Sequence, residues 1–178
     1  MSLTDRELWT AIHGMVLGAA FLLAFSGGLA GLYGLRHDWL THGGLLADLR
    51  RLVAGTWIMA ILAWLTVIVG TWIVYPWYRA EPPVGEEVDL THYPRSFLLE
   101  NPDLAAWHNF GMEWKEHVAW MSPILATAVA YVVLRYGLRL SETPEVRRAM
   151  IVLFTLAFIA AGVAGLFGAF ITKAAPLL

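Results

Sequence analysis

Long apolar segments alternate with short polar connections along the whole chain. A membrane-spanning helix needs about 20 consecutive apolar residues. Four segments reach or approach that length, at about residues 8–35, 52–75, 107–139 and 149–172, and Pro123 should kink the third of them. The longest connection covers about residues 76–106. The pattern predicts an all-α integral membrane protein, a bundle of four transmembrane helices in a single membrane domain.

Composition supports this prediction and narrows the chemistry. The chain is 58% hydrophobic with a mean hydropathy of +0.61, which excludes an ordinary soluble domain. It has no cysteine, so disulfides, iron–sulfur clusters and covalently attached haem are excluded. The first seven residues lack a basic region and the apolar run after them is long. We therefore expect this segment to be a permanent helix rather than a cleaved signal peptide.

One pattern occurs twice. The first copy reads His13, an apolar stretch, Tyr33-Gly34-Leu35-Arg36, a turn, Arg50-Arg51 and a second apolar stretch. The second copy reads His117, an apolar stretch, Tyr136-Gly137-Leu138-Arg139, a shorter turn, Arg147-Arg148 and a last apolar stretch. The repetition predicts two helical hairpins related by a pseudo-twofold axis along the membrane normal. Such an axis would place the two histidines at equal depth, facing one another.

Charge predicts the orientation of these hairpins. Arginines gather at both hairpin turns, at Arg36, Arg50, Arg51, Arg135, Arg139, Arg147 and Arg148. Short loops rich in Lys and Arg stay on the cytoplasmic side of a membrane. We therefore expect both termini and the long loop on the outer side, which is the periplasmic side in a bacterial inner membrane.

The paired histidines are the first candidate site. Two opposed imidazoles inside a helical bundle can hold a six-coordinate haem iron, so His13 and His117 are predicted as axial ligands of one non-covalent haem b. Gly27 and Gly31 share the face of His13 and would leave room for a flat cofactor, while Trp120 lies at the edge of the His117 face. The alternatives are that these glycines only allow close helix packing, and that the two imidazoles only form interfacial hydrogen bonds.

Two further sites involve the same region. Glu113 and His117 are four residues apart and share a helix face, so with Glu116 and His13 they could bind non-haem iron, copper or zinc. The alternative for both glutamates is a solvated interfacial face. A further hypothesis is a quinone-binding pocket near the outer interface. Its proton acceptors would be His108, Glu113, Glu116 and Tyr75, and its walls Trp72, Trp77, Trp107 and Trp114.

In helix number and in its histidine pair the chain resembles, in outline, the four-helix b-type cytochrome subunits of respiratory enzymes. The leading hypothesis is a cytochrome b subunit that passes electrons between quinone and an outer-face partner, with Glu113 and Glu116 releasing protons. Its partners would be the lipid bilayer, other membrane subunits or further copies of the chain, and a periplasmic redox protein. A cofactor-free structural or assembly subunit and a transporter are the alternatives. The charge balance and composition exclude nucleic-acid binding.

Overall fold

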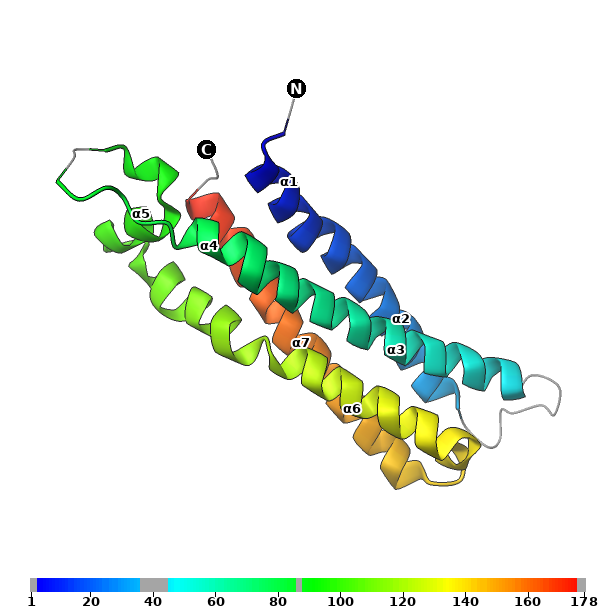
Figure 1. Ribbon diagram of the computed structural model, residues 1–178. Coiled ribbons are helices and arrows are strands. Elements are labelled where there is room, and N and C mark those ends of the chain that lie inside the picture. Colours follow the sequence, from blue (N-terminus) through cyan, green and yellow to red (C-terminus); the bar gives the residue numbers. More distant parts are fainter. Residues whose placement is uncertain (1–2, 36–44, 86–87, 176–178) are drawn as a thin grey trace. The chain divides into compact units, whose positions relative to one another are not determined.

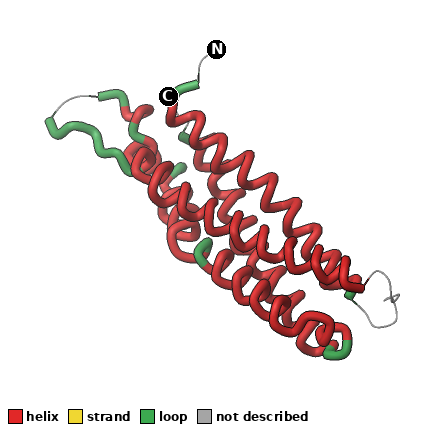
Figure 2. Tube along the Cα trace, turned by 45° about the vertical axis from the view of Figure 1, so that its right-hand side comes forward, coloured by secondary structure: helices red, strands yellow, loops and turns green. Residues whose placement is uncertain are grey.

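The computed structural model describes residues 3–35, 45–85 and 88–175, and 86% of the structure is helix, with no strand among these residues (Figures 1 and 2). Within them, four helices are long and apolar enough to cross a membrane: Asp5–Gly34, Leu46–Tyr78, Trp107–Ser141 and Pro144–Ala174. This result confirms the all-α class, and it is compatible with an integral membrane protein in a lipid bilayer.

Contacts between residues divide the chain into two compact units. Unit 1 consists of Met1–Gly18, Leu65–Trp120 and Gly162–Leu178. Unit 2 consists of Ala19–Trp64 and Met121–Ala161. All the predicted site residues except Gly27 and Gly31 lie in unit 1.

Unit 2 is built from parts of four helices, namely α2 (Leu17–Gly34), α3 (Leu45–Val69), α6 (Met121–Tyr136) and α7 (Pro144–Ala174). Its core includes the fully buried Leu32, Met59 and Phe154. The helices α2 and α3 approach closely at Gly28 and Gly55, where a Cβ on Gly55 would lie 3.7 Å from the Gly28 backbone. Small residues allow such backbone proximity in membrane helices, where van der Waals packing drives association.

The connection between α6 and α7 is the hairpin turn that the structure describes. Gly137 has a φ of +54°, a left-handed conformation that favours glycine, and begins the 3₁₀ helix η7 (Gly137–Ser141). Arg147 donates a hydrogen bond to the backbone carbonyl of Leu35, which joins the start of α7 to the end of α2. The predicted turn of the other hairpin, with Arg36, lies outside the described residues.

Unit 1 is distinguished by π-helical segments. These are η1 (Ile12–Val16), η3 (Gly70–Val74), η5 (Trp107–Met112) and η6 (Trp114–Val118), and among the described residues every π-helical segment belongs to this unit. A π-helical turn is rare and often marks a functional site. Unit 1 therefore combines most of the candidate residues with the least regular helical backbone.

The remaining elements of unit 1 are short. Helix α1 (Asp5–Ala11) begins with a capping box, in which Thr4 and Glu7 bond each other's backbone N–H groups. α4 (Tyr75–Tyr78) ends the second long helix, and η4 (Leu90–His92) and α5 (Pro94–Glu100) follow in the long loop. The Thr91 backbone N–H donates to Asp89 Oδ1 at 3.0 Å and lowers the pKa of this carboxyl group below its ordinary value.

The third long helix is interrupted between η6 and α6, at Ala119 and Trp120. Pro123 lies in the first turn of α6, and a proline ring clashes with the carbonyl group four residues earlier, here that of Ala119. The helix is therefore broken at the residue whose carbonyl group the proline ring would clash with, four residues before Pro123. The long helices also extend beyond the predicted apolar segments, since the second begins at Leu45 and continues to Tyr78.

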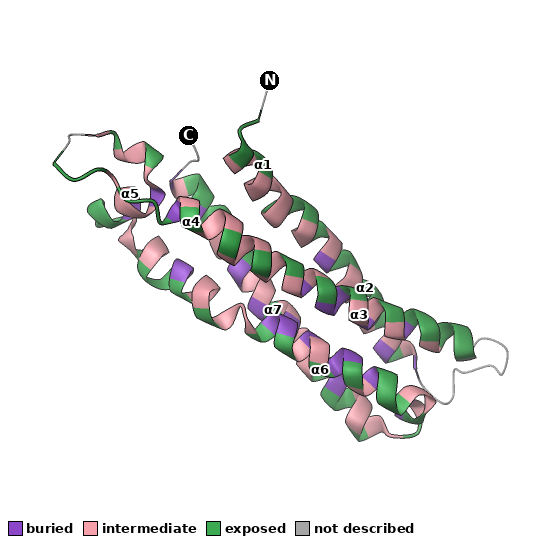
Figure 3. Cartoon of the chain, viewed as in Figure 1, coloured by how far each residue is buried: buried purple, intermediate pink, exposed green. Residues whose placement is uncertain are grey.

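Exposed residues occur along every long helix (Figure 3), and many of them are large and apolar. Leu23, Met15 and Leu166 are examples, with exposed fractions of 75%, 74% and 61%. Such a surface suits contact with lipid tails or with apolar partner helices.

Candidate functional site

His13 lies in the π-helical segment η1 of unit 1, with its ring against the backbone of Gly70. A Cβ added at Gly70 would lie 2.8 Å from His13 Cε1, so the glycine makes the place that the imidazole occupies. The ring is within hydrogen-bonding reach of the Thr66 backbone. Its Nδ1 is buried and has no hydrogen-bond partner among the described residues.

His117 lies in another π-helical segment, η6, and its surroundings differ from those of His13. Its Nδ1 is 3.0 Å from the backbone carbonyl oxygen of Glu113 and 3.3 Å from Glu113 Oε2. The side chain of His117 is 70% exposed. The other ring nitrogen, Nε2, makes no hydrogen bond to any described residue.

The two histidines have one feature in common. Each has one ring nitrogen close to a backbone group, Thr66 for His13 and Glu113 for His117, and one without a partner among the described residues, Nδ1 in His13 and Nε2 in His117. No hydrogen bond or ring contact joins the two imidazoles in the described structure. Trp120, predicted to lie beside them, packs edge-to-face against Trp72 with ring centroids 6.2 Å apart.

Lys115 is a polar residue of unit 1 that sequence reasoning missed. Its Nζ donates to the Ala164 backbone carbonyl at 3.3 Å. The same atom lies 2.7 Å from the place that a Cβ on Gly168 would take, so this glycine makes room for the ammonium group. Lys115 is also close enough to His13 for their charges to repel. In the sequence Lys115 lies next to Glu116, and nothing in that pattern indicated that the lysine side chain points inward.

A second group of polar residues forms what we call the outer polar cluster: Tyr75, Tyr78, His108, Glu116 and Arg79. Tyr78 Oη is 2.8 Å from His108 Nδ1, and the two rings stack with centroids 5.9 Å apart. The Tyr75 hydroxyl is within hydrogen-bonding reach of Glu116 and accepts from Arg79 Nη1 at 3.4 Å. The structure thus brings together three of the four predicted proton acceptors, His108, Glu116 and Tyr75, and adds Tyr78.

The fourth predicted acceptor, Glu113, is engaged with His117 as described above, and its side chain is 55% exposed. Aromatic residues predicted as pocket walls pack within unit 1. Trp107 stacks on Phe170 at 5.2 Å between centroids, and Trp114 lies edge-on to Phe167 at 6.2 Å. These contacts fix the two indoles against α7.

The non-haem metal hypothesis needs at least three suitable side chains in one place. Within the part of the chain that the structure describes, no group of three His, Cys, Asp or Glu residues is arranged to hold a metal ion. Glu113 and His117 form an i,i+4 pair. The structure therefore gives the non-haem metal alternative no support.

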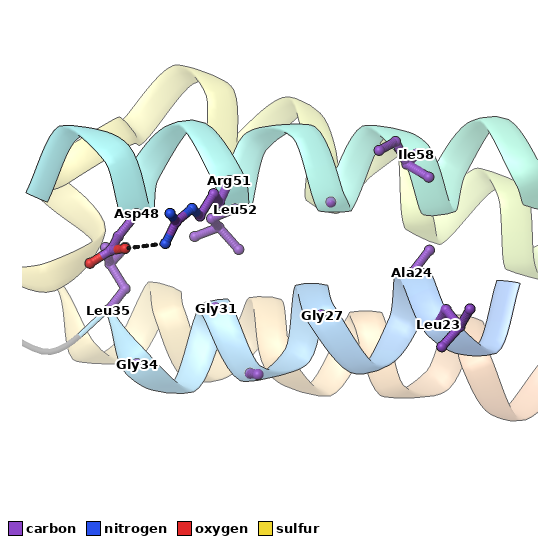
Figure 4. Close-up of a pocket in the computed structure, with 12 residues that line it drawn as sticks. Leu23, Ala24, Gly27, Gly31, Gly34, Leu35, Asp48, Arg51, Leu52 and Ile58 are labelled. Carbon is purple, nitrogen blue, oxygen red and sulfur yellow. Dashed lines mark ion pairs between the residues drawn. The ribbon is translucent and has the colours of Figure 1, made fainter. Parts of the chain in front are cut away.

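Gly27 and Gly31 lie in unit 2, where they line an open groove of about 510 Å³ between α2 and α3 (Figure 4). A Cβ on Gly27 would meet nothing within 4 Å, whereas one on Gly31 would lie 3.0 Å from Leu52 Cδ1. The Asp48–Arg51 ion pair, at 3.6 Å, lies at one end of the groove. The two glycines predicted to border the cofactor thus line a groove whose walls combine small residues with leucine and isoleucine side chains.

Comparisons of the chain with protein-family models, with curated proteins and with solved structures found no match. No residue's role is transferred from a relative. The chemistry of the two histidines and of the outer polar cluster carries the proposal that follows.

Proposed function

We propose that this protein is a b-type cytochrome subunit of a membrane complex, which passes electrons between quinol and a redox partner on the outer face. One observation carries the proposal. His13 and His117, at matching positions of the two halves of the sequence, both lie in π-helical segments and both keep one ring nitrogen without a hydrogen bond.

The donor set fits one haem b. Histidines that ligate metals normally hold the second ring nitrogen on a carboxylate or backbone carbonyl, which fixes the ring and raises its basicity. Glu113 supplies this contact to His117, and the backbone of Thr66 is in reach of His13. The packing of the His13 ring against Gly70 is a further supporting feature, because it would hold the imidazole in one place. A bis-His haem, when bound, takes up and gives back one electron at a time.

The outer polar cluster supports the quinol side of the proposal. Oxidation of a quinol releases protons, which need acceptors within hydrogen-bonding distance. The pair Tyr78 Oη and His108 Nδ1 offers one route, because the imidazole can take a proton on its other nitrogen. Glu116, close to the Tyr75 hydroxyl, offers a second, and the exposed Glu113 would pass protons to the outer solution.

The spectrum of the purified protein tests the haem. We expect a sharp low-spin b-type signal in the dithionite-reduced minus air-oxidised spectrum, and its loss in both His13→Ala and His117→Ala. The matched control is His92→Ala, a histidine of the long loop in η4, which should keep the signal. Circular dichroism would verify that each variant remains helical. A flat spectrum from protein purified under haem-retaining conditions would contradict the proposal.

The orientation of the chain is a separate proposal. The arginine-rich turns favour a cytoplasmic location, with the termini and the long loop periplasmic in a bacterial inner membrane. Because the chain has no cysteine, single cysteines can report on each side. Val84→Cys, at a fully exposed loop position, should react with a membrane-impermeant maleimide in intact spheroplasts. Glu142→Cys, between α6 and α7, should react only after permeabilisation. The reverse order would show the opposite orientation.

A cofactor-free structural subunit is the second candidate, and the groove of unit 2 favours it. Its glycine-lined wall between α2 and α3 is a surface on which an apolar partner helix could pack closely. Under this alternative His13→Ala and His117→Ala would leave the absorbance and the assembly of the complex unchanged. Gly27→Leu would instead release the partner subunits, because its side chain would fill the open groove.

A further inference from the structure

Buried polar atoms without a hydrogen-bond partner gather on one face of the first helix. The described part of the chain contains seven buried side-chain nitrogen or oxygen atoms without a hydrogen-bond partner. Four of them belong to three residues of α1 and η1, namely Arg6 Nε and Nη2, Thr10 Oγ1 and His13 Nδ1. The spacing of four and three residues places these side chains on the same helix face.

Thr10 lacks a bond that five other helical hydroxyl groups of this protein form, and Ser122 in α6 likewise has no partner for its hydroxyl oxygen among the described residues. Ser26, Thr56, Thr127, Thr155 and Thr172 each donate to the backbone carbonyl four residues earlier. Thr10 has no such bond. Its hydroxyl group therefore remains available to a partner on the Arg6 and His13 face.

Arg6 lacks an acidic partner among the residues that the structure describes. Its Nη1 donates to the His92 carbonyl at 3.5 Å, and it forms no ion pair with any described residue. The nearest acids along the chain are Asp5, which is exposed, and Glu7, whose carboxylate accepts from Thr4 N at 2.7 Å and from Thr4 Oγ1 at 3.0 Å. Two guanidinium nitrogens are consequently buried without an acceptor.

Apolar packing on this helix does not offset the free-energy cost of burying these unpartnered polar atoms. A buried polar group without a partner costs about 1–3 kcal/mol, and more when it is charged. Neither α1 nor η1 contains a fully buried residue, so little apolar burial compensates on this helix. The helix α1 contacts η3 without a buried core of its own.

We propose that Arg6 and Thr10, on the helix face that they share with His13, form a binding site for an oxyanion, a carboxylate or a phosphate, carried by a membrane-resident ligand. A guanidinium group recognises such oxyanions through two parallel N–H donors, and the Thr10 hydroxyl adds a third. Lys115, close to His13, increases the positive charge beside the face. The oxyanion has two possible sources, a propionate of the haem, which rests on the proposed function, and the headgroup of an anionic phospholipid, which does not.

Native mass spectrometry and haem analysis of the full chain distinguish these sources. The protein would be reconstituted into nanodiscs of equal phosphatidylglycerol and phosphatidylcholine, and bound lipid and haem would be counted in wild type, Arg6→Gln and Thr10→Val. If a phospholipid is the ligand, Arg6→Gln should lose phosphatidylglycerol adducts about tenfold while phosphatidylcholine is unchanged. If a haem propionate is the ligand, the haem content should fall and its midpoint potential should shift, with lipid adducts unchanged.

The controls are exposed cations elsewhere, Lys173→Gln in unit 1 and Arg148→Gln in unit 2. Thr10→Val is nearly isosteric, so it keeps the test valid even if Arg6→Gln folds poorly. Arg6 and Thr10 variants with the lipid and haem content of the two controls would overturn the oxyanion site. Absence of haem from the wild type, with phosphatidylglycerol loss in Arg6→Gln, would reject the cytochrome proposal alone.

Discussion

Replacing Gly28 with alanine is expected to destabilise unit 2 by about 1–3 kcal/mol, the usual cost of overpacking a core. The new Cβ would lie 2.7 Å from Phe154 Cζ and 2.8 Å from Cε1. The Phe154 ring cannot retreat easily, because it is fully buried and stacks on Phe25 with centroids 5.5 Å apart. Thermal unfolding followed by tryptophan fluorescence in detergent would measure the effect.

The preceding residue is the matched control. A Cβ on Gly27 would meet nothing within 4 Å, so Gly27→Ala should be neutral or stabilising by up to about 1 kcal/mol, the helix propensity difference. Phe154→Leu in the Gly28→Ala background should recover part of the loss, and the two changes should not be additive. Equal midpoints for Gly27→Ala and Gly28→Ala would contradict the close contact.

The transmembrane segments could be predicted because apolar length alone decides them. The ends of the helices could not be predicted in the same way. Charged residues mark where a helix leaves the bilayer, but the helix can continue beyond that point. The helix α3 thus continues through Arg50 and Arg51 back to Leu45, although the apolar run begins at residue 52. The second long helix, Leu46–Tyr78, passes Pro76, which is tolerated because it falls in the first turn of α4.

The arrangement of the histidines was not accessible from the repeat. A repeat predicts equal depth, but the direction of a side chain depends on every turn of its helix. A π-helical turn contains one residue more than an α-helical turn and rotates the following residues by about 100°. Two such segments, η5 and η6, precede or contain His117. The i,i+4 spacing predicted the pairing of His117 with Glu113, but the exposure of His117 and the inward direction of Lys115 depend on a backbone irregularity that apolar periodicity does not reveal.

Replacing Gly70 with valine is expected to remove His13 from its place in unit 1. Even the first carbon of the new side chain would come within 2.8 Å of His13 Cε1 and 3.3 Å of Nε2. An imidazole has two side-chain torsions and cannot shorten, so it must rotate away from η3. Under the cytochrome proposal, the haem content should fall about tenfold or more, the cost of disturbing a ligand and its supporting contacts.

A readout without haem separates the geometry from the proposed function. Diethylpyrocarbonate modifies accessible imidazoles, so mass spectrometry should find little modification of His13 in the wild type and much more in Gly70→Val. Gly14→Val is the control, because a Cβ there would meet nothing within 4 Å and the residue adjoins His13 itself. If Gly70→Val increases the modification of His13 without loss of haem, the contact between His13 and Gly70 in the wild type is supported. The same result would contradict the proposal that His13 is a haem ligand. Equal modification in both valine variants would contradict the contact with Gly70, on which the position of His13 depends.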